Sequence, residues 1–207
     1  MTRRSESHVL PAPGMSRFRV KGHVWRGALD YYAMRVPGGG DALLRALPPA
    51  LRGFCGQPFL AGALYDALPI AQVSDIAARL CGVERASILR DRARWQAMRD
   101  LRGIYRALLV FTSPRSVALR LGRMAIQYFD FGSVQASMTA PTTCEIVERG
   151  VPAPLAPCMA PIAEGWATLA LSWAGAYGAE LQADPPLLEG RQQGMEIYVI
   201  RIRLSWI

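Results

Sequence analysis

Few side chains in this sequence could carry out covalent or acid-base chemistry, and their spacing does not form a familiar catalytic motif. The two histidines, His8 and His23, both lie near the N-terminus, so a serine or cysteine nucleophile further along the chain would have no nearby base in sequence. Glu145 and Glu148 fall at the end of a predicted strand, where surface solvation explains two carboxylates. Glu164 lies on a predicted apolar helix, and we interpret it as that helix's polar face. We therefore predict a protein that is not an enzyme.

The four cysteines lie far apart and form no C-x-x-C pair of the kind that holds zinc or performs redox chemistry. We interpret Cys55, Cys81, Cys144 and Cys158 as buried thiols in a reducing compartment, which predicts a cytoplasmic protein. The N-terminus has basic residues but no apolar segment of signal-peptide length. No stretch approaches the roughly 18 apolar residues that a spanning helix needs. We predict no metal, no cofactor and no membrane span.

The elements that would position these side chains change in type along the chain. Residues 1–16 mix Ser, Pro, Gly and Arg without periodicity, which predicts a flexible N-terminal tail, and residues 17–207 are expected to form a single domain. After a short strand near Phe18, the sequence predicts mainly helices, of which the longest spans about Glu84 to Phe111. Ser113 and Pro114 are typical of the start of the next helix.

Strand patterns dominate after Gly132. "SVQASMTA" and "TCEIVERG" each alternate and predict an antiparallel hairpin, which a helix from about Pro157 to Gly175 follows. "GAELQA" predicts a weak strand, and "MEIYVIRIRLSWI" predicts the clearest strand of the chain. The expected fold is α+β, with an N-terminal helical layer packed on a small C-terminal antiparallel sheet built by a β-β-α-β-β block.

Aromatic side chains are frequent enough along the predicted helices to line an apolar pocket. Small-molecule pockets are largely apolar with a few polar groups, which this inventory suits. The simpler interpretation is that these side chains only fill the core. The candidate ligand-binding residues are Tyr31, Trp95, Tyr105, Tyr128, Phe129, Trp166 and Trp173.

Arginines recur every seventh residue along the longest predicted helix, at Arg85, Arg92, Arg99 and Arg106. They suit a solvated helix face with acidic partners in the chain, or alternatively a surface that binds a protein partner or a second copy of the chain. The net charge of +8 would also allow nucleic-acid binding. That third interpretation is disfavoured, because no helix-turn-helix and no interleaving of aromatic and basic residues accompanies the charge.

Four segments carry a resemblance to a known family: "ALYDALPIAQVSDIAARL", "YRALLVFTSPRSVALRLGRMAIQYFDFG", "CMAPIAEGWATLALSWAG" and "IYVIRIRLSW". Together they resemble a myxobacterial paralogous family of proteins of about this length, over most of residues 18–207. That family in turn is similar to vinyl-reductase-type ligand-binding domains and to haem-dependent nitric-oxide-binding domains. The resemblance implies a sensory or scaffolding role, pairing with partner proteins, and a small apolar ligand, haem or acyl chain between the helices and the C-terminal sheet.

The sequence departs from these relatives at their cofactor sites. The haem-binding relatives have an axial histidine and a Y-x-S-x-R clamp for the propionates, and this chain has neither a Y-x-S-x-R motif nor a histidine beyond His23. Some aromatic-sensing relatives hold zinc with clustered cysteines, and here only Cys144 and Cys158 occupy the corresponding region. Two thiolates leave a tetrahedral zinc site incomplete. The resemblance therefore carries over the fold and an apolar pocket, without the cofactors.

Overall fold

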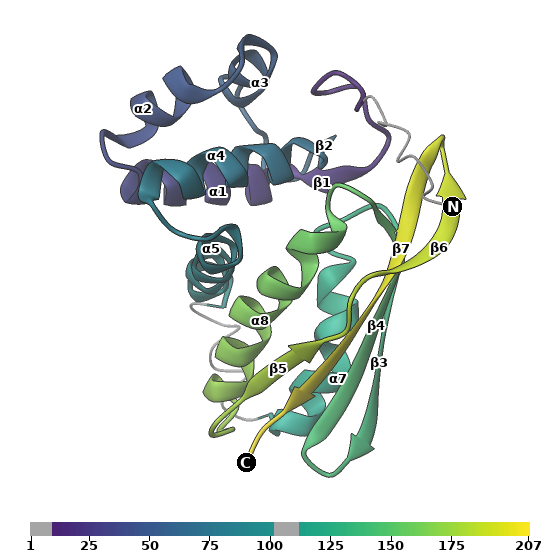
Figure 1. Cartoon of the computed structure of the whole chain (residues 1–207). Coiled ribbons are helices and arrows are strands. Elements are labelled where there is room, and N and C mark those ends of the chain that lie inside the picture. The colour runs from purple at the N-terminus through teal and green to yellow at the C-terminus, as the bar shows by residue number, and fades with distance from the viewer. Residues whose placement is uncertain (1–9, 102–111) are drawn as a thin grey trace.

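A computed structural model of the chain describes residues 10–101 and 112–207, and in these residues most helices precede the main sheet (Figure 1). The N-terminal half contains α1 (Gly22–Arg35), α2 (Gly39–Ala46), α3 (Pro49–Cys55), α4 (Pro69–Cys81) and α5 (Arg85–Asp100), with a two-stranded ribbon of β1 (Arg19–Lys21) and β2 (Leu64–Asp66). The C-terminal half contains α7 (Pro114–Ala125), β3 (Ser133–Ala140), β4 (Thr143–Pro152), α8 (Ala156–Trp173), β5 (Glu180–Ala183), β6 (Leu187–Gln192) and β7 (Met195–Ser205). The predicted α+β fold is confirmed.

The last strand, β7, organises the sheet. It pairs antiparallel with β4 along one edge and with β5 and then β6 along the other, while β3 pairs with β4 as the predicted hairpin. The sequence analysis predicted β5 and β7 but missed β6. The C-terminal block therefore has one more strand than the predicted β-β-α-β-β order. Residues of β6 are mostly exposed, and the strand therefore has no apolar alternation that could reveal it.

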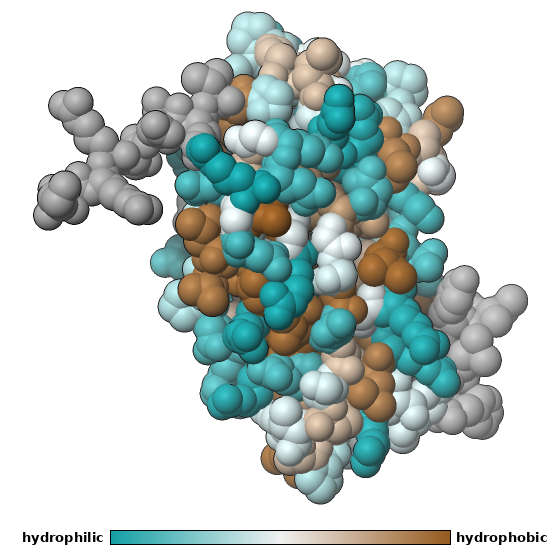
Figure 2. Space-filling view, turned by 90° about the vertical axis from the view of Figure 1, so that its right-hand side faces the viewer, coloured by the Kyte–Doolittle hydropathy of each residue, from teal (hydrophilic) through white to brown (hydrophobic). Residues whose placement is uncertain are grey.

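One face of the sheet packs on helices and the other does not (Figure 1). On the helix side, Cys144 pairs with Leu204 and Ile146 with Ile202, and all four side chains are buried. The opposite face carries polar side chains, and Glu145 forms an ion pair there with Arg201 at 3.7 Å. Figure 2 shows this side of the molecule, with hydrophilic residues spread across it and apolar ones between them. Apolar-in, polar-out alternation is typical of an antiparallel sheet with one solvated face.

Two glycines allow the helices to approach their neighbours closely. A Cβ atom at Gly165 on α8 would lie 2.1 Å from the carbonyl oxygen of Arg90 on α5. A Cβ atom at Gly122 on α7 would lie 2.9 Å from the carbonyl oxygen of Val134 on β3. The missing Cβ atoms let α8 pack closely on α5 and α7 on β3, and the space between those elements is where the candidate site lies.

The chain before β1 is attached to the helical half by one buried carboxylate. The backbone N–H groups of Gly14 and Ser16 both donate to Oδ2 of Asp66, at 2.9 and 3.1 Å. The predicted division into a tail of residues 1–16 and one domain of residues 17–207 stays a prediction. Among the described residues, no helix is both long and apolar enough to cross a membrane.

The longest predicted helix differs from the observed one in its extent and in its buried face. Helix α5 ends at Asp100, with Leu101 as its C-cap, and residues 102–111 lie outside the described part of the chain. The large apolar residues Trp95 and Met98 of this helix are only half-buried. The observed buried face consists of Ile88, Leu89, Arg92, Ala93, Gln96 and Ala97.

Candidate functional site

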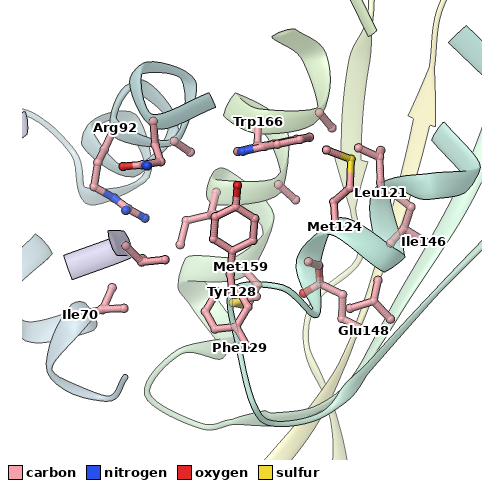
Figure 3. A pocket seen from close by; sticks show the side chains of 18 residues that line it. Ile70, Arg92, Leu121, Met124, Tyr128, Phe129, Ile146, Glu148, Met159 and Trp166 are labelled. Carbon is pink, nitrogen blue, oxygen red and sulfur yellow. The ribbon is translucent and has the colours of Figure 1, made fainter. Parts of the chain in front are cut away.

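A cavity of about 110 Å³, partly open to solvent, lies between the helices and the sheet (Figure 3). Its walls come from α5, α7 and α8, from the helix-facing side of β3 and β4, and from single residues of α1 and α4. Most of the lining is apolar, and Leu121 and Met124 of α7, Ile146 of β4 and Met159 of α8 are examples. This is the location that the sequence resemblance implied for a ligand.

Unpaired polar atoms concentrate at this cavity. In the described residues, five buried side-chain nitrogen or oxygen atoms have no hydrogen-bond partner. Four of them belong to residues that line the cavity, namely Arg92 Nε, Gln96 Oε1, Glu148 Oε2 and Trp166 Nε1. The fifth, Arg90 Nε, lies 2.7 Å from a carboxylate oxygen of Glu164. Because unpaired buried polar groups are rare and costly in folded proteins, their gathering around one space makes it the candidate site.

Arg92 is the most unusual of these residues, because it is only 3% exposed and makes no hydrogen bond or ion pair within the described chain. Its guanidinium points into the cavity from the α5 side (Figure 3). Arg92 lies one helical turn from Ile88 and one from Gln96, so all three share the buried face of α5. Its charge also reaches α1, where burial raises the pKa of Tyr32 and the charge of Arg92 opposes that rise.

The other described members of the arginine row reach solvent. Arg85 pairs with Asp75 on α4 at 3.1 Å, and Arg99 pairs with Asp30 on α1 at 2.9 Å. Arg85 and Arg99 lie at the two ends of α5, whereas Arg92 lies midway, where neighbouring elements cover the helix. The predicted partner-binding row is therefore not one continuous exposed surface, since its central residue faces the cavity. Arg106 lies outside the described residues.

Glu148 contributes a buried carboxyl from the sheet. It follows Cys144 and Ile146 at spacings of two on β4, and it is paired across the sheet with Val134 on β3 and Ile200 on β7. Burial raises its pKa from 4.5 to about 7. The interpretation of Glu148 as a solvated surface carboxylate was wrong, because the period of the strand places it on the buried face, where it is 6% exposed.

A hydrogen-bond network fixes one wall of the cavity. Asp100, in the last turn of α5, accepts a bond from Gln96 Nε2 through Oδ1 at 2.8 Å. Its Oδ2 accepts a bond from the hydroxyl of Tyr128, also at 2.8 Å. Tyr128 and Phe129 follow α7, so Asp100 ties that segment to α5 and holds the ring of Tyr128 at the cavity.

Three of the seven candidate ligand-binding aromatics line the cavity, namely Tyr128, Phe129 and Trp166. Tyr31 and Trp95 do not; they pack on each other with ring centroids 5.8 Å apart, and Arg99 stacks on Trp95 at 4.6 Å. Trp173 is at the end of α8 and does not line it either. Tyr105 lies outside the described residues.

The sequence analysis did not assign Glu148 or Gln96 to the site and placed Arg92 on a surface. The signals were present in the spacing, because Arg92 and Gln96 follow Ile88 at four-residue intervals and Glu148 follows Ile146 by two. They were overlooked because charged and amide side chains are mostly exposed.

The comparisons with known proteins identify the fold. No protein-family model and no curated protein matches the chain. Among solved structures, a Cs H-NOX mutant is 10% identical with a TM-score of 0.64, over 90% of this chain and 96% of that one. A K. algicida H-NOX mutant in the unliganded Fe(II) state is 12% identical with a TM-score of 0.63, over 90% and 96%. An oxygen-binding H-NOX domain related to soluble guanylate cyclases is 10% identical with a TM-score of 0.58, over 90% and 94%. The chain therefore has the fold of H-NOX domains, which are named for haem binding.

The residues of this cavity do not fit a haem. Its volume of about 110 Å³ is well below the roughly 300–1,000 Å³ of pockets for drug-sized ligands. His23, the one histidine among the described residues, does not line it; its ring lies 5.0 Å from that of Tyr128, and its Nδ1 is 3.3 Å from the carbonyl oxygen of Ala61. In the described part of the chain, no three His, Cys, Asp or Glu side chains are grouped so as to hold a metal ion.

Proposed function

We propose that this protein is a non-enzymatic sensory or regulatory domain that binds a small apolar or aromatic molecule in the cavity between the helices and the sheet. The observation that carries the proposal is the cavity itself, which is apolar over most of its surface and contains four unpaired polar atoms. Small-molecule sites typically have this composition, with an apolar wall for affinity and a few polar groups for orientation.

The lining supports binding without covalent chemistry. The described residues around the cavity include no histidine, cysteine or serine, so no nucleophile and base are paired there. The fold supports a sensory role by likeness, because the solved structures that share it include an oxygen complex of an H-NOX domain related to soluble guanylate cyclases. Membership of the myxobacterial family, and residence in the cytoplasm, are further parts of this proposal that rest on the sequence.

The test is thermal unfolding of the purified protein with neutral hydrophobes of one ring, such as toluene. A ligand that binds only the folded state raises Tm, and saturation at 100 times the Kd contributes about 2.7 kcal/mol. We expect a rise in Tm for wild type and none for Ala163→Phe, because Ala163 lines the cavity and the larger ring would fill it. Native mass spectrometry of gently purified protein would show any molecule that is retained from the cell.

A matched control is Ala46→Phe, at an exposed position on α2 that does not line the cavity. This variant is expected to respond to toluene as wild type does. The proposal is contradicted if no one-ring compound, neutral or charged, raises Tm, or if the response of Ala163→Phe equals that of Ala46→Phe.

A protein-interaction or homodimerisation role is the second proposal carried over from the sequence. Arg85 and Arg99 are the described arginines of the row that reach solvent, and each is already ion-paired within the chain. Such surface pairs contribute about 0–1 kcal/mol and can exchange partners at low cost.

A further inference from the structure

We propose that the molecule bound in this cavity is a small carboxylic acid in its anionic form, with its carboxylate on Arg92 and Trp166 and its single ring or short chain against the apolar wall. This inference rests on the proposed function, since it names the class of ligand for the same cavity.

The first support is the uncompensated charge of Arg92. A guanidinium stays protonated in proteins and carries five N–H donors. Here the residue is 3% exposed, and its buried Nε has no hydrogen-bond acceptor within the described residues. Burying an unpaired charge costs several kcal/mol, and proteins normally avoid that cost by pairing the charge. A carboxylate supplies what is missing, because its two oxygens accept two parallel N–H bonds from a guanidinium.

The second support is a neutral donor that points into the same space. Trp166 Nε1 is buried and has no acceptor, and an indole nitrogen can only donate. In Figure 3 the nitrogens of Arg92 and Trp166 both point inward, from α5 and from α8. Two of the four unpaired atoms at the cavity are therefore donors, and the positive charge of Arg92 favours an anionic ligand over a neutral or cationic one.

The carboxyl groups around the cavity leave this positive charge uncompensated. Asp100 is occupied by its hydrogen bonds from Gln96 and Tyr128. Glu148 approaches from the sheet, on the other side of the cavity from Arg92 in Figure 3, and forms no ion pair with it. Because burial raises its pKa to about 7, Glu148 is largely protonated in mildly acidic solution, where it can donate a hydrogen bond without repelling an anion.

The size of the cavity limits the rest of the ligand. An apolar cavity of about 150 Å³ engineered in another protein accepts benzene, and this one measures about 110 Å³. One aromatic ring or a short aliphatic chain therefore fits, and Met124 and Met159 can adjust to its shape because methionine side chains are flexible. Benzoate is a probe of suitable charge and size.

The experiment is isothermal titration calorimetry with benzoate, neutral benzamide and toluene, at pH 6 and low salt. For wild type we expect benzoate to bind at least tenfold more tightly than benzamide. Arg92→Met should lose that ratio while it keeps toluene binding, and its Tm should equal or exceed that of wild type because an unpaired charge has been removed. Arg85→Met is the matched control, one heptad earlier on α5 and only partly buried, outside the cavity lining, and it should keep the ratio.

The outcomes distinguish a failure of the carboxylate assignment from a failure of the proposed function. If wild type binds benzamide or toluene as tightly as benzoate, the cavity binds small molecules and the carboxylate assignment is overturned. If none of the three probes binds, the proposed function fails as well. If Arg85→Met loses the ratio together with Arg92→Met, long-range charge explains the preference and Arg92 is not the binding residue. The comparison of benzoate with benzamide in wild type remains decisive even if Arg92→Met does not fold.

Discussion

At the scale of single residues, Arg92 and Glu148 occupy positions where the surrounding pattern calls for apolar side chains. Arg92 lies on the buried face of α5, and Glu148 lies between Val134 and Ile200 on the helix-facing side of the sheet. Both are expensive to bury, and proteins tolerate such local costs chiefly at functional sites. Replacing either residue by an uncharged one should therefore relieve a cost to folding stability and change ligand binding, and the two effects can be measured separately.

Glu148→Gln is predicted to remove a pH dependence of stability. The pKa of Glu148 rises from 4.5 in the unfolded chain to about 7 in the folded one, so the folded state holds its proton more tightly. Stability from this group is present below pH 4.5 and is lost as the pH rises through 7, by about 3 kcal/mol. In urea unfolding, the free energy of unfolding of wild type should fall from pH 5 to pH 8 relative to that of Glu148→Gln.

Glu145→Gln is the matched control, because Glu145 lies on the same strand, points to the solvated face and pairs with Arg201. It should follow wild type between pH 5 and pH 8. Equal pH profiles for wild type and Glu148→Gln would show that this carboxyl is not buried as described.

At the scale of elements, the width of the cavity depends on how closely α8 approaches α5. Gly165→Ala would place a methyl group against the carbonyl oxygen of Arg90, and backbone cannot move aside as a side chain can. Overpacking of this kind costs about 1–3 kcal/mol. We expect that loss in the free energy of unfolding, together with weaker ligand binding, since Trp166 is the next residue of α8.

The matched control is Gly53→Ala on α3, where an added Cβ would meet no atom within 4 Å. Helix propensity predicts a gain of up to about 1 kcal/mol there. A loss of stability at Gly53→Ala, or none at Gly165→Ala, would contradict the described packing of α8 on α5.

The strands and the site differ in how well the sequence could predict them. The alternation in β3, β4 and β7 is strong because one face of the sheet is buried, so the hairpin and the last strand followed from a period of two. Strand β6 lacks that contrast because both its faces are mostly exposed. The site required something that periodicity does not report, namely which charged residue on a helix lies under a neighbouring element.

At the scale of the whole molecule, one layer of helices covers one face of the sheet, and the cavity lies where α5, α7 and α8 meet that face (Figures 1 and 3). The resemblance inferred from diffuse sequence segments is confirmed in its fold, since the chain shares the fold of H-NOX domains at 10–12% identity. A fold can be kept while its site changes, and here the cavity is too small for haem but retains space for a smaller molecule.

The most direct test of ligand binding in this cavity is a titration of the ¹⁵N-labelled protein with toluene, followed through the tryptophan indole N–H resonances. Trp166 lines the cavity with an unpaired indole N–H, whereas the indole of Trp25 donates to the backbone oxygen of Asp66 at 2.9 Å and serves as an internal reference. We predict that the Trp166 resonance shifts and saturates at one equivalent of bound ligand while that of Trp25 stays in place. A Trp166 resonance that does not move, or that moves only in step with that of Trp25, would contradict the account.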